Sequence, residues 1–150
     1  NKDAYSIQTS INRVWHIFQH WDNYNLPNTI KNNKKLFGAY LAGIIDGDGT
    51  VKIKNNKDRV IPQYVVKIAS DCPLQEIKFL IEKYLNCSVY FEYDSNKKGN
   101  GVNTCFYLSK KNIDSVKHIV YPYIVLPHKK ERLEKYFRVI SEPARIRTGI

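Results

Sequence analysis

Residues 34–49 read KKLFGAYLAGIIDGDG, and this stretch decides the fold because it joins a buried helix to an acidic, glycine-rich end. Apolar residues at every turn predict a central helix from Lys34 to Asp46, and Gly47 and Gly49 are typical of a helix stop. A helical wheel separates the apolar positions into a small side and a large side. The small side holds Ala39, Ala42, Gly43 and Asp46, and the large side holds Phe37, Tyr40, Leu41, Ile44 and Ile45.

The small side of this helix predicts a close helix–helix contact. Small residues let a neighbouring backbone approach closely, while large apolar side chains anchor a helix in its own core. A second copy of the same helix fits the small side. We therefore predict a dimer interface made by Ala39, Ala42, Gly43 and Asp46.

Alternating and periodic segments after residue 49 predict an α+β fold. Pro122 and Pro127 are expected to separate the last two helices, and Asp71 to cap the helix after the second strand. The resulting order is αββαββα with a last helix, which predicts a four-stranded antiparallel sheet backed by helices. Strands are expected at Thr50–Asn56, Val60–Ser70, Val89–Asp94 and Asn103–Ser109, and helices at 74–85, Asn112–Tyr121 and His128–Glu142.

Residues 1–33 predict a separate extension. Apolar and aromatic residues between Ala4 and Trp21 recur at helical spacing, whereas the Asn-rich stretch Asp22–Lys35 has no sustained period and is typical of a linker. We therefore divide the chain into an N-terminal helical extension with its linker, 1–33, and a folded domain, 34–150.

The composition limits the classes of partner. The 150 residues are 43% hydrophobic, enough for one core, and 24 Lys and Arg against 14 Asp and Glu give a net charge of +10. This surplus on a small body favours nucleic acid. Cys72, Cys87 and Cys105 are too far apart for a CxxC pair, and no apolar run approaches about 18 residues. We expect a soluble, intracellular protein without a zinc site or a membrane partner, in the cytoplasm or an organelle.

The end of the central helix is predicted to bind cations. Unpaired carbonyls and the negative end of the helix dipole coincide there with the carboxylates of Asp46 and Asp48. If two copies pack about a two-fold axis, their Asp48 carboxylates lie near one another, and a hard divalent ion such as Mg²⁺ relieves the repulsion. The alternative is an ordinary helix end with solvated acids, which is unfavourable because helix C-termini prefer cations.

The motif LAGIIDGDG, Leu41–Gly49, resembles the LAGLIDADG motif and departs from it only at Ile44 and Gly47. The predicted order of elements also resembles that family of intron-encoded homing endonucleases, so the resemblance covers residues 34–142. Family enzymes with one motif per chain are homodimers, and this chain has a single motif. The resemblance therefore implies a homodimeric, Mg²⁺-dependent endonuclease that hydrolyses double-stranded DNA at a long, nearly palindromic site.

The resemblance also implies roles for individual residues. Asp48 is the expected catalytic and metal-binding carboxylate, with the Gly47 carbonyl as a second ligand; the metals would activate a water and stabilise the departing 3′ oxygen. Lys129 matches a family lysine near the active site, and a solvated Lys in a first helical turn is the alternative. A family position after the second strand that is often polar falls at Ser70 or Asp71; Ser70 is the expected catalytic residue, and a helix cap is the alternative.

The uncovered face of the sheet is predicted to lie along the major groove of DNA, which is wide enough for β-ribbons. Val51, Ile53, Phe106 and Leu108 are expected to face the core, so alternate residues face outward. On the third strand, Tyr90 shares a face with Glu92, unless a register slip places Phe91 and Tyr93 there instead. Charged residues at the hairpin tips are either phosphate contacts or solvated turns. The DNA-binding candidates are Lys52, Lys54, Asn56, Lys57, Arg59, Gln63, Lys67, Tyr90, Lys97, Lys98, Tyr107 and Ser109.

Alternatives to a nuclease remain open at this point. LAGLIDADG-like proteins include intron RNA-binding maturases and non-cleaving DNA-binding regulators, and net charge does not distinguish DNA from RNA. Retention of Asp48 argues against a degenerate copy. An intein would need flanking splicing blocks, which the sequence does not resemble. A protein-docking role explains the aromatic N-terminal helix but not the Asp48 turn.

Overall fold

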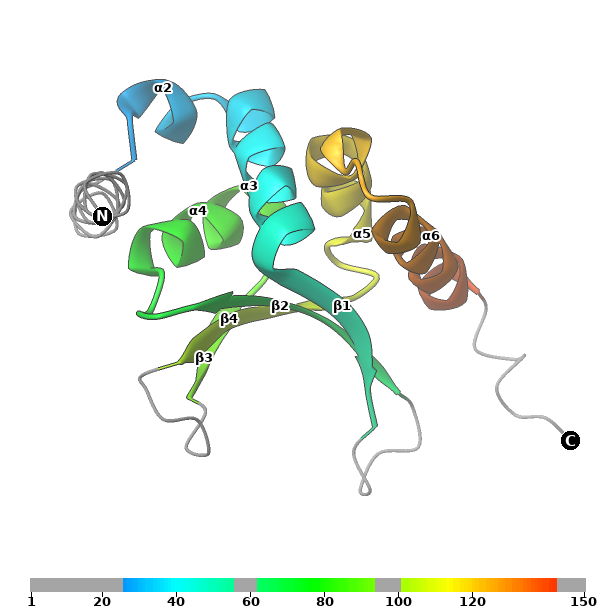
Figure 1. Ribbon diagram of the computed structural model, residues 1–150. Helices are drawn as coiled ribbons and strands as arrows, with labels where there is room; N and C mark the ends of the chain where they lie inside the picture. Colours follow the sequence, from blue (N-terminus) through cyan, green and yellow to red (C-terminus); the bar gives the residue numbers. More distant parts are fainter. Residues whose placement is uncertain (1–25, 56–61, 94–100, 143–150) are drawn as a thin grey trace, which may run out of the picture.

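The computed structural model describes residues 26–55, 62–93 and 101–142 (Figure 1). The predicted α+β order of helix, two strands, helix, two strands and final helices is confirmed. The predicted helix between Ala4 and Trp21 lies outside the described residues. The elements are α2 (Asn28–Lys31), α3 (Lys34–Asp48), β1 (Gly49–Lys54), β2 (Gln63–Ser70), α4 (Gln75–Leu85), β3 (Val89–Tyr93), β4 (Val102–Leu108), α5 (Ile113–Ser115), η1 (Val116–Val120), η2 (Tyr121–Tyr123) and α6 (Pro127–Ser141).

The central helix α3 begins with a side-chain cap. The Leu36 amide donates to Asn33 Oδ1 at 3.1 Å, which satisfies one of the amides that have no acceptor within the helix. The helix ends at Asp48 rather than at the predicted Asp46, because Gly47 keeps a helical conformation and Gly49 begins the strand. Asp48 is therefore held by the last turn of a helix and not by a loop.

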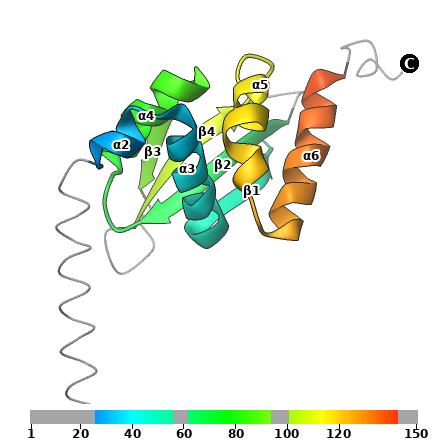
Figure 2. The same cartoon turned by 90° about the horizontal axis from the view of Figure 1, so that it is seen from above.

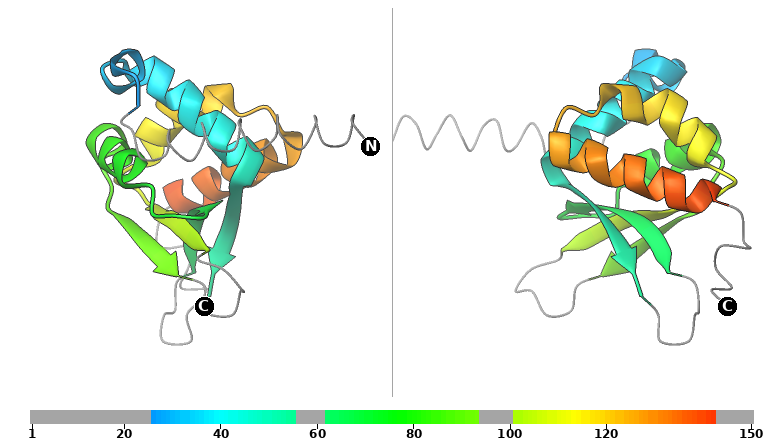
Figure 3. Two further views of the ribbon diagram at one scale, coloured as in Figure 1. Left: turned by 60° about the vertical axis from the view of Figure 1, so that its left-hand side comes forward. Right: turned by 90° about the vertical axis from the view of Figure 1, so that its right-hand side faces the viewer.

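The strands form one antiparallel sheet in the order β1-β2-β4-β3. Helices cover one face of it: α3, η1 and α6 lie side by side above the strands in Figure 2, and α4 lies toward the β3 edge. Figure 3 shows that no described helix lies on the opposite face. The amphipathic alternation of the strands follows from this arrangement, since one face packs and the other meets solvent.

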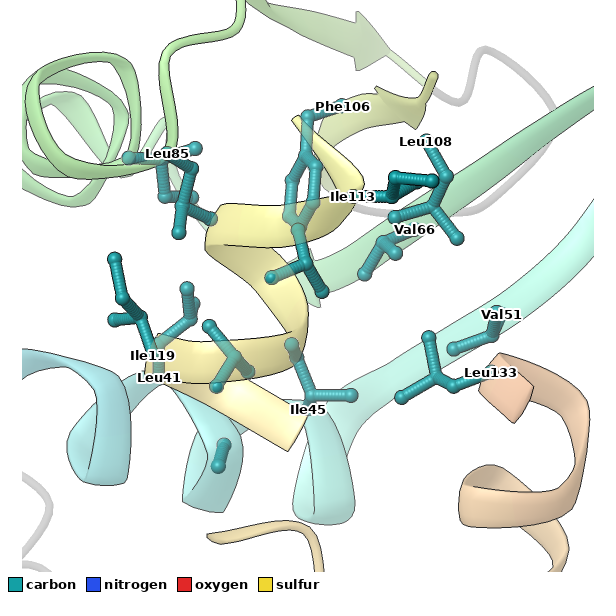
Figure 4. Packing of buried hydrophobic residues seen from close by; sticks show 14 of the residues in the cluster. Leu41, Ile45, Val51, Val66, Leu85, Phe106, Leu108, Ile113, Ile119 and Leu133 are labelled. Carbon is teal, nitrogen blue, oxygen red and sulfur yellow. The ribbon is translucent and has the colours of Figure 1, made fainter. Parts of the chain in front are cut away.

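The hydrophobic core fills the space between the helices and the sheet. Val66 and Phe106 form a cross-strand pair at its centre, and Leu41 and Ile45 of α3 reach toward the same layer (Figure 4). Fully burying each such side chain contributes roughly 1.5–3 kcal/mol. Ile53 was predicted to join this core but is 41% exposed, because it lies near the end of an edge strand.

One local prediction in the helices is wrong, and the structure refines another. Asp71 does not cap α4, which begins after Pro73 with Leu74 at its N-cap and without a side-chain cap. The expected helix Asn112–Tyr121 is a helical run whose winding changes from α to π to 3-10 across α5, η1 and η2. Hydrophobic periodicity predicted that this segment is helical but did not predict the type of helix. None of the helices in the described ranges is long and apolar enough to cross a membrane.

Gly38 allows α3 and η1 to approach one another. A Cβ at this position would lie 1.9 Å from the backbone oxygen of Ile119. We expect Gly38→Ala to destabilise the protein by about 3 kcal/mol or more, because the oxygen can move only with the backbone and overpacking exceeds the roughly 1 kcal/mol that Ala gains in a helix. Urea unfolding followed by circular dichroism measures the loss, and an unchanged midpoint would show that the two segments are not in contact.

Candidate functional site

The C-terminal end of α3 places Asp48 where the helical layer meets the sheet. Asp48 is the last residue of α3, and β1 begins at the next residue, Gly49. Asp48 and Gly47 are both exposed. The helix dipole adds negative potential to the carboxylate at this position. The arrangement concentrates oxygen atoms that can bind a metal ion at one end of the sheet.

These donors have the chemistry of a hard-cation site. Carboxylate and backbone carbonyl oxygens are the ligands that Mg²⁺ and Ca²⁺ take in proteins, so the Asp48 carboxylate and the Gly47 carbonyl fit a divalent ion by type. Within residues 26–55, 62–93 and 101–142, no three His, Cys, Asp or Glu side chains gather into a metal-binding group. One chain thus offers a small part of a coordination shell.

Asp46 makes contacts that its predicted place in a dimer interface did not anticipate. Its carboxylate accepts hydrogen bonds from the amides of Val125, at 2.8 Å, and Leu126, at 3.2 Å. These amides directly precede Pro127, the first residue of α6. Asp46 therefore joins the end of α3 to the start of α6 within one chain.

Lys129 lies at the same junction. The residue is only 8% exposed, and its Nζ donates to the carbonyls of Ile45 at 2.5 Å and Asp46 at 2.8 Å. A cation is favourable at the C-terminal end of a helix, and a buried ammonium group requires such partners. The structure brings Lys129 next to the Asp48 turn, with its charge directed at helix carbonyls.

Ser70 makes local contacts at the end of β2. Its hydroxyl donates to the Cys72 carbonyl at 2.7 Å and lies 3.4 Å from the Val102 carbonyl. It closes the bend that leads toward α4. These hydrogen bonds give Ser70 a structural role at the bend but do not make it a cap of α4. Its catalytic role stays a prediction.

The exposed face of α3 differs from the predicted small side. Ala42 is fully buried within its own chain, Ala39 is half-buried, and Gly43 and Gly47 are exposed. Leu36 and Tyr40 are large but remain 43% and 37% exposed. The helical wheel therefore placed Ala42 and Tyr40 on the wrong sides of α3. The side of α3 that packs closely against η1 requires small residues, whereas the wheel assigned the large apolar residues to the buried side. A narrow glycine-containing face with apolar edges stays uncovered.

The open face of the sheet carries basic and aromatic side chains in register. Lys52, Val65 and Tyr107 lie opposite one another on the neighbouring strands β1, β2 and β4. Lys67, Cys105 and Tyr90 do the same on β2, β4 and β3. The third strand follows the first predicted register, because Val89 is buried on the helix side. Phe91 and Tyr93 therefore lie on the helix side of β3, and Phe91 contacts the Lys78 ammonium of α4 at 5.5 Å. Lys54 and Gln63 pair at the end of the first hairpin.

Two stacked tyrosines form a ridge on this face. The rings of Tyr90 and Tyr107 lie 5.3 Å apart, and Lys54 Nζ lies 5.7 Å and 5.9 Å from their centres and 3.3 Å from the Tyr107 hydroxyl. Cys105 lies beneath and is completely buried. Burial, together with the neighbouring Tyr107 hydroxyl, raises the pKa of Tyr90, and burial raises the pKa of the Cys105 thiol. Tyr90 and Cys105 are therefore uncharged, and Lys54 brings a positive charge to the ridge.

An ion pair lies beside the ridge. Lys67 Nζ donates to Glu92 Oε1 at 2.7 Å, and this hydrogen bond lowers the pKa of Glu92 below its usual value. Glu92 is thus a carboxylate on an otherwise basic face.

Of the remaining DNA-binding candidates, the structure describes Ser109, which lies beyond the last residue of β4. Its amide donates to Asn112 Oδ1 at 2.9 Å. The buried Asn112 also donates to the Tyr107 carbonyl at 2.6 Å. The hairpin-tip candidates Asn56, Lys57, Arg59, Lys97 and Lys98 lie outside the described residues.

No protein-family model and no curated protein matches the chain. Solved structures of LAGLIDADG homing endonucleases resemble it. I-SmaMI bound to uncleaveable DNA is 19% identical, with a TM-score of 0.46 over 69% of this chain and 36% of that chain. I-CeuI, a group I intron-encoded homing endonuclease complexed with DNA, is 13% identical, with a TM-score of 0.49 over 93% of this chain and 68% of that chain. I-GzeII in complex with its DNA target is 14% identical, with a TM-score of 0.45 over 78% of this chain and 36% of that chain. The chain thus spans about a third of the I-SmaMI and I-GzeII chains, and the likeness concerns the fold.

Arg132 was not among the predicted site residues. Its Nη1 donates to the Val51 carbonyl at 3.2 Å, which ties α6 to the strand that follows Asp48. Arg132 lies three residues after Lys129, one turn along the same side of α6. This spacing was a signal in the sequence that the two cations act at one junction.

Proposed function

We propose that this chain is a site-specific DNA endonuclease of the LAGLIDADG homing type, which hydrolyses both strands of double-stranded DNA as a homodimer. The observation that carries the proposal is the position of Asp48. Its exposed carboxylate ends α3 at the point where the open-faced sheet begins. A divalent ion held by a carboxylate in this place could contact a phosphate of a duplex that lies against the sheet.

The open face supports DNA as the substrate. Lys52, Lys54 and Lys67 come from two neighbouring strands, and the face is free of described helices (Figure 3). A two-stranded ribbon fits the major groove, where lysines and polar side chains contact phosphates and base edges. The net charge of +10 favours association with a polyanion. Gln63 and Tyr107 add polar groups at the same face.

The exposed face of α3 supports a second copy of the chain as the partner. Leu36, Tyr40, Gly43 and Gly47 recur along the outside of the helix, where Gly43 has open space around it. An isologous interface uses the same face twice, so two copies would meet about a two-fold axis along α3. The two Asp48 residues would then lie on the same side of the dimer, one for each DNA strand.

The division of labour follows from the donor types. Asp48 and the Gly47 carbonyl would hold a divalent ion, which supplies charge stabilisation at the phosphate and at the departing 3′ oxygen. The second copy, DNA phosphate and water complete the shell. Lys52 and Lys54 neutralise phosphates along the groove, and the tyrosine ridge offers contact area between them.

Selection from a randomised double-stranded DNA library tests this function. The full chain is incubated with the library in Mg²⁺ or in EDTA, and cut molecules are sequenced. We expect one long, nearly palindromic sequence, cut on both strands only with Mg²⁺. Binding to an intron RNA or to DNA without any cleavage would overturn the proposal and favour a maturase or a regulator.

The Lys67–Glu92 pair gives a graded test of the DNA-facing surface. Glu92→Gln removes a negative charge and releases Lys67 for phosphate, so we expect non-specific DNA affinity to rise about threefold and the salt slope to steepen by up to about one. Fluorescence anisotropy at several salt concentrations measures both. Glu76→Gln is the matched control, because Glu76 pairs with Lys31 at 2.6 Å on the helix side. Equal effects of the two variants would argue against binding through this face.

A further inference from the structure

The ends of α3 and α6 are capped by each other's side chains. Asp46 of α3 accepts from the amides of Val125 and Leu126, at 2.8 Å and 3.2 Å, in the two residues that lead into α6, of which Leu126 is the N-cap. Amides at a helix start have no acceptor in the helix, and a carboxylate is favourable there. Asp46 thus supplies acceptors for the amides that lead into α6, although it is 79 residues from Val125 in the sequence.

Lys129 returns the contact from α6 to α3. Its buried ammonium donates to the carbonyls of Ile45 and Asp46, at 2.5 Å and 2.8 Å. Carbonyls in the last turn of a helix lack donor partners within the helix, and a cation is favourable at this end. The Ile45 carbonyl also accepts from the amide of the C-cap residue Gly49. We call Asp46 and Lys129 together the clamp. Its four hydrogen bonds lie at the junction that immediately precedes Gly47 and Asp48.

We propose that the clamp is a positioning device for the Asp48 site, which sets its affinity for a divalent cation. The inference rests on the proposed function, because it takes Asp48 as the metal-binding carboxylate. The clamp fixes the last turn of α3 against α6, and that turn determines where the Gly47 carbonyl and the Asp48 carboxylate stand. Ligand sites with a fixed geometry bind more tightly because less motion is lost on binding.

In this proposal Lys129 acts on the metal site indirectly, by holding the last turn of α3, and does not contact the metal or the DNA itself. To contact a phosphate directly, the ammonium would have to leave two carbonyls and its buried position, and both are costly. Arg132 strengthens the junction from the next turn of α6, through the Val51 carbonyl at 3.2 Å. Lys129 and Asp46 are therefore positioning residues, whereas Asp48 is the residue that contacts the metal.

Binding of Mn²⁺ to the protein bound to its selected DNA duplex tests the clamp, with electron paramagnetic resonance as the readout. Mn²⁺ takes the same oxygen ligands as Mg²⁺ and is visible to this method. The Asp48→Asn complex gives the background from DNA. We expect Asp46→Asn and Lys129→Met each to weaken the Asp48-dependent binding by about 10- to 100-fold, the range typical for groups that orient metal ligands. The double variant should be little worse than either, because both side chains hold one junction.

Lys130→Met is the matched control, since it removes the same charge from the adjacent residue. Circular dichroism at the assay temperature confirms that each variant is folded. Lower thermal stability with unchanged Mn²⁺ affinity would reduce the clamp to a purely structural contact and overturn the proposal. Slower cleavage by Lys129→Met at unchanged Mn²⁺ affinity would also overturn it and make Lys129 a catalytic residue. Absence of Asp48-dependent binding in the unmodified protein would instead contradict the proposed function itself.

Discussion

Asp48→Asn is expected to reduce the rate of DNA cleavage by about 10³-fold or more, while DNA binding is retained. A metal held at the reacting phosphate contributes several kcal/mol of charge stabilisation, and each 1.36 kcal/mol corresponds to about tenfold in rate. Asparagine has nearly the same shape as aspartate but lacks the charge that holds a divalent ion. Asp48 is exposed at the end of α3, so the substitution should leave the fold intact.

The measurement is single-turnover cleavage of the selected duplex, with anisotropy of the uncut duplex in EDTA as the binding assay. Binding in EDTA should be equal or slightly tighter, because the variant removes a carboxylate that repels phosphate. Asp114→Asn is the control, since it removes another exposed carboxylate, from α5. Cleavage by Asp48→Asn at the unmodified rate, or an equal loss in both variants, would rule out a metal role for this residue.

Local sequence patterns predicted the two hairpins and the end of α3, because these features depend on residues that are close together in the sequence. Alternation between Thr50 and Ser70 and between Val89 and Ser109 predicted both hairpins, because period-two burial is a property of each strand. The glycines around Asp48 predicted the end of α3 to within two residues of its observed place. The open face of the first hairpin followed from the same alternation. In contrast, Ile53 could not be placed, because its exposure depends on how far the helical layer extends over β1.

Contacts between distant segments were not predictable from local patterns. The wheel placed Tyr40 inward and Ala42 outward, because it equates large apolar side chains with burial. In the structure η1 approaches α3 so closely that small residues are required on the inner side, as Gly38 shows. The place of Asp46 was missed for the same reason: its partners lie 79 and 80 residues away. Nothing in the central stretch of sequence marks that junction.

Gly43→Arg is expected to weaken the dimer by about 30-fold or more without unfolding the chain. No atom lies within 4 Å of a Cβ placed at Gly43, so a single chain accepts the new side chain. In an isologous dimer the clash occurs twice, and overpacking of about 1–3 kcal/mol at each site weakens association by about 30-fold at least. Because each subunit is proposed to cut one strand, double-strand cleavage should fall with the dimer.

Sedimentation equilibrium over a range of protein concentrations measures this dissociation, and urea unfolding of the monomer measures its stability. Replacing a helical glycine should leave that stability unchanged or raise it by up to about 1 kcal/mol, the reverse of the effect of Gly38→Ala on the buried side of the same helix. Ser141→Arg adds the same charge at an exposed position at the end of α6 and should leave the dimer intact. A Gly43→Arg protein that stays dimeric and cuts both strands would place the subunit interface elsewhere. The exposed face of α3, with Leu36 and Tyr40, would then need a different partner.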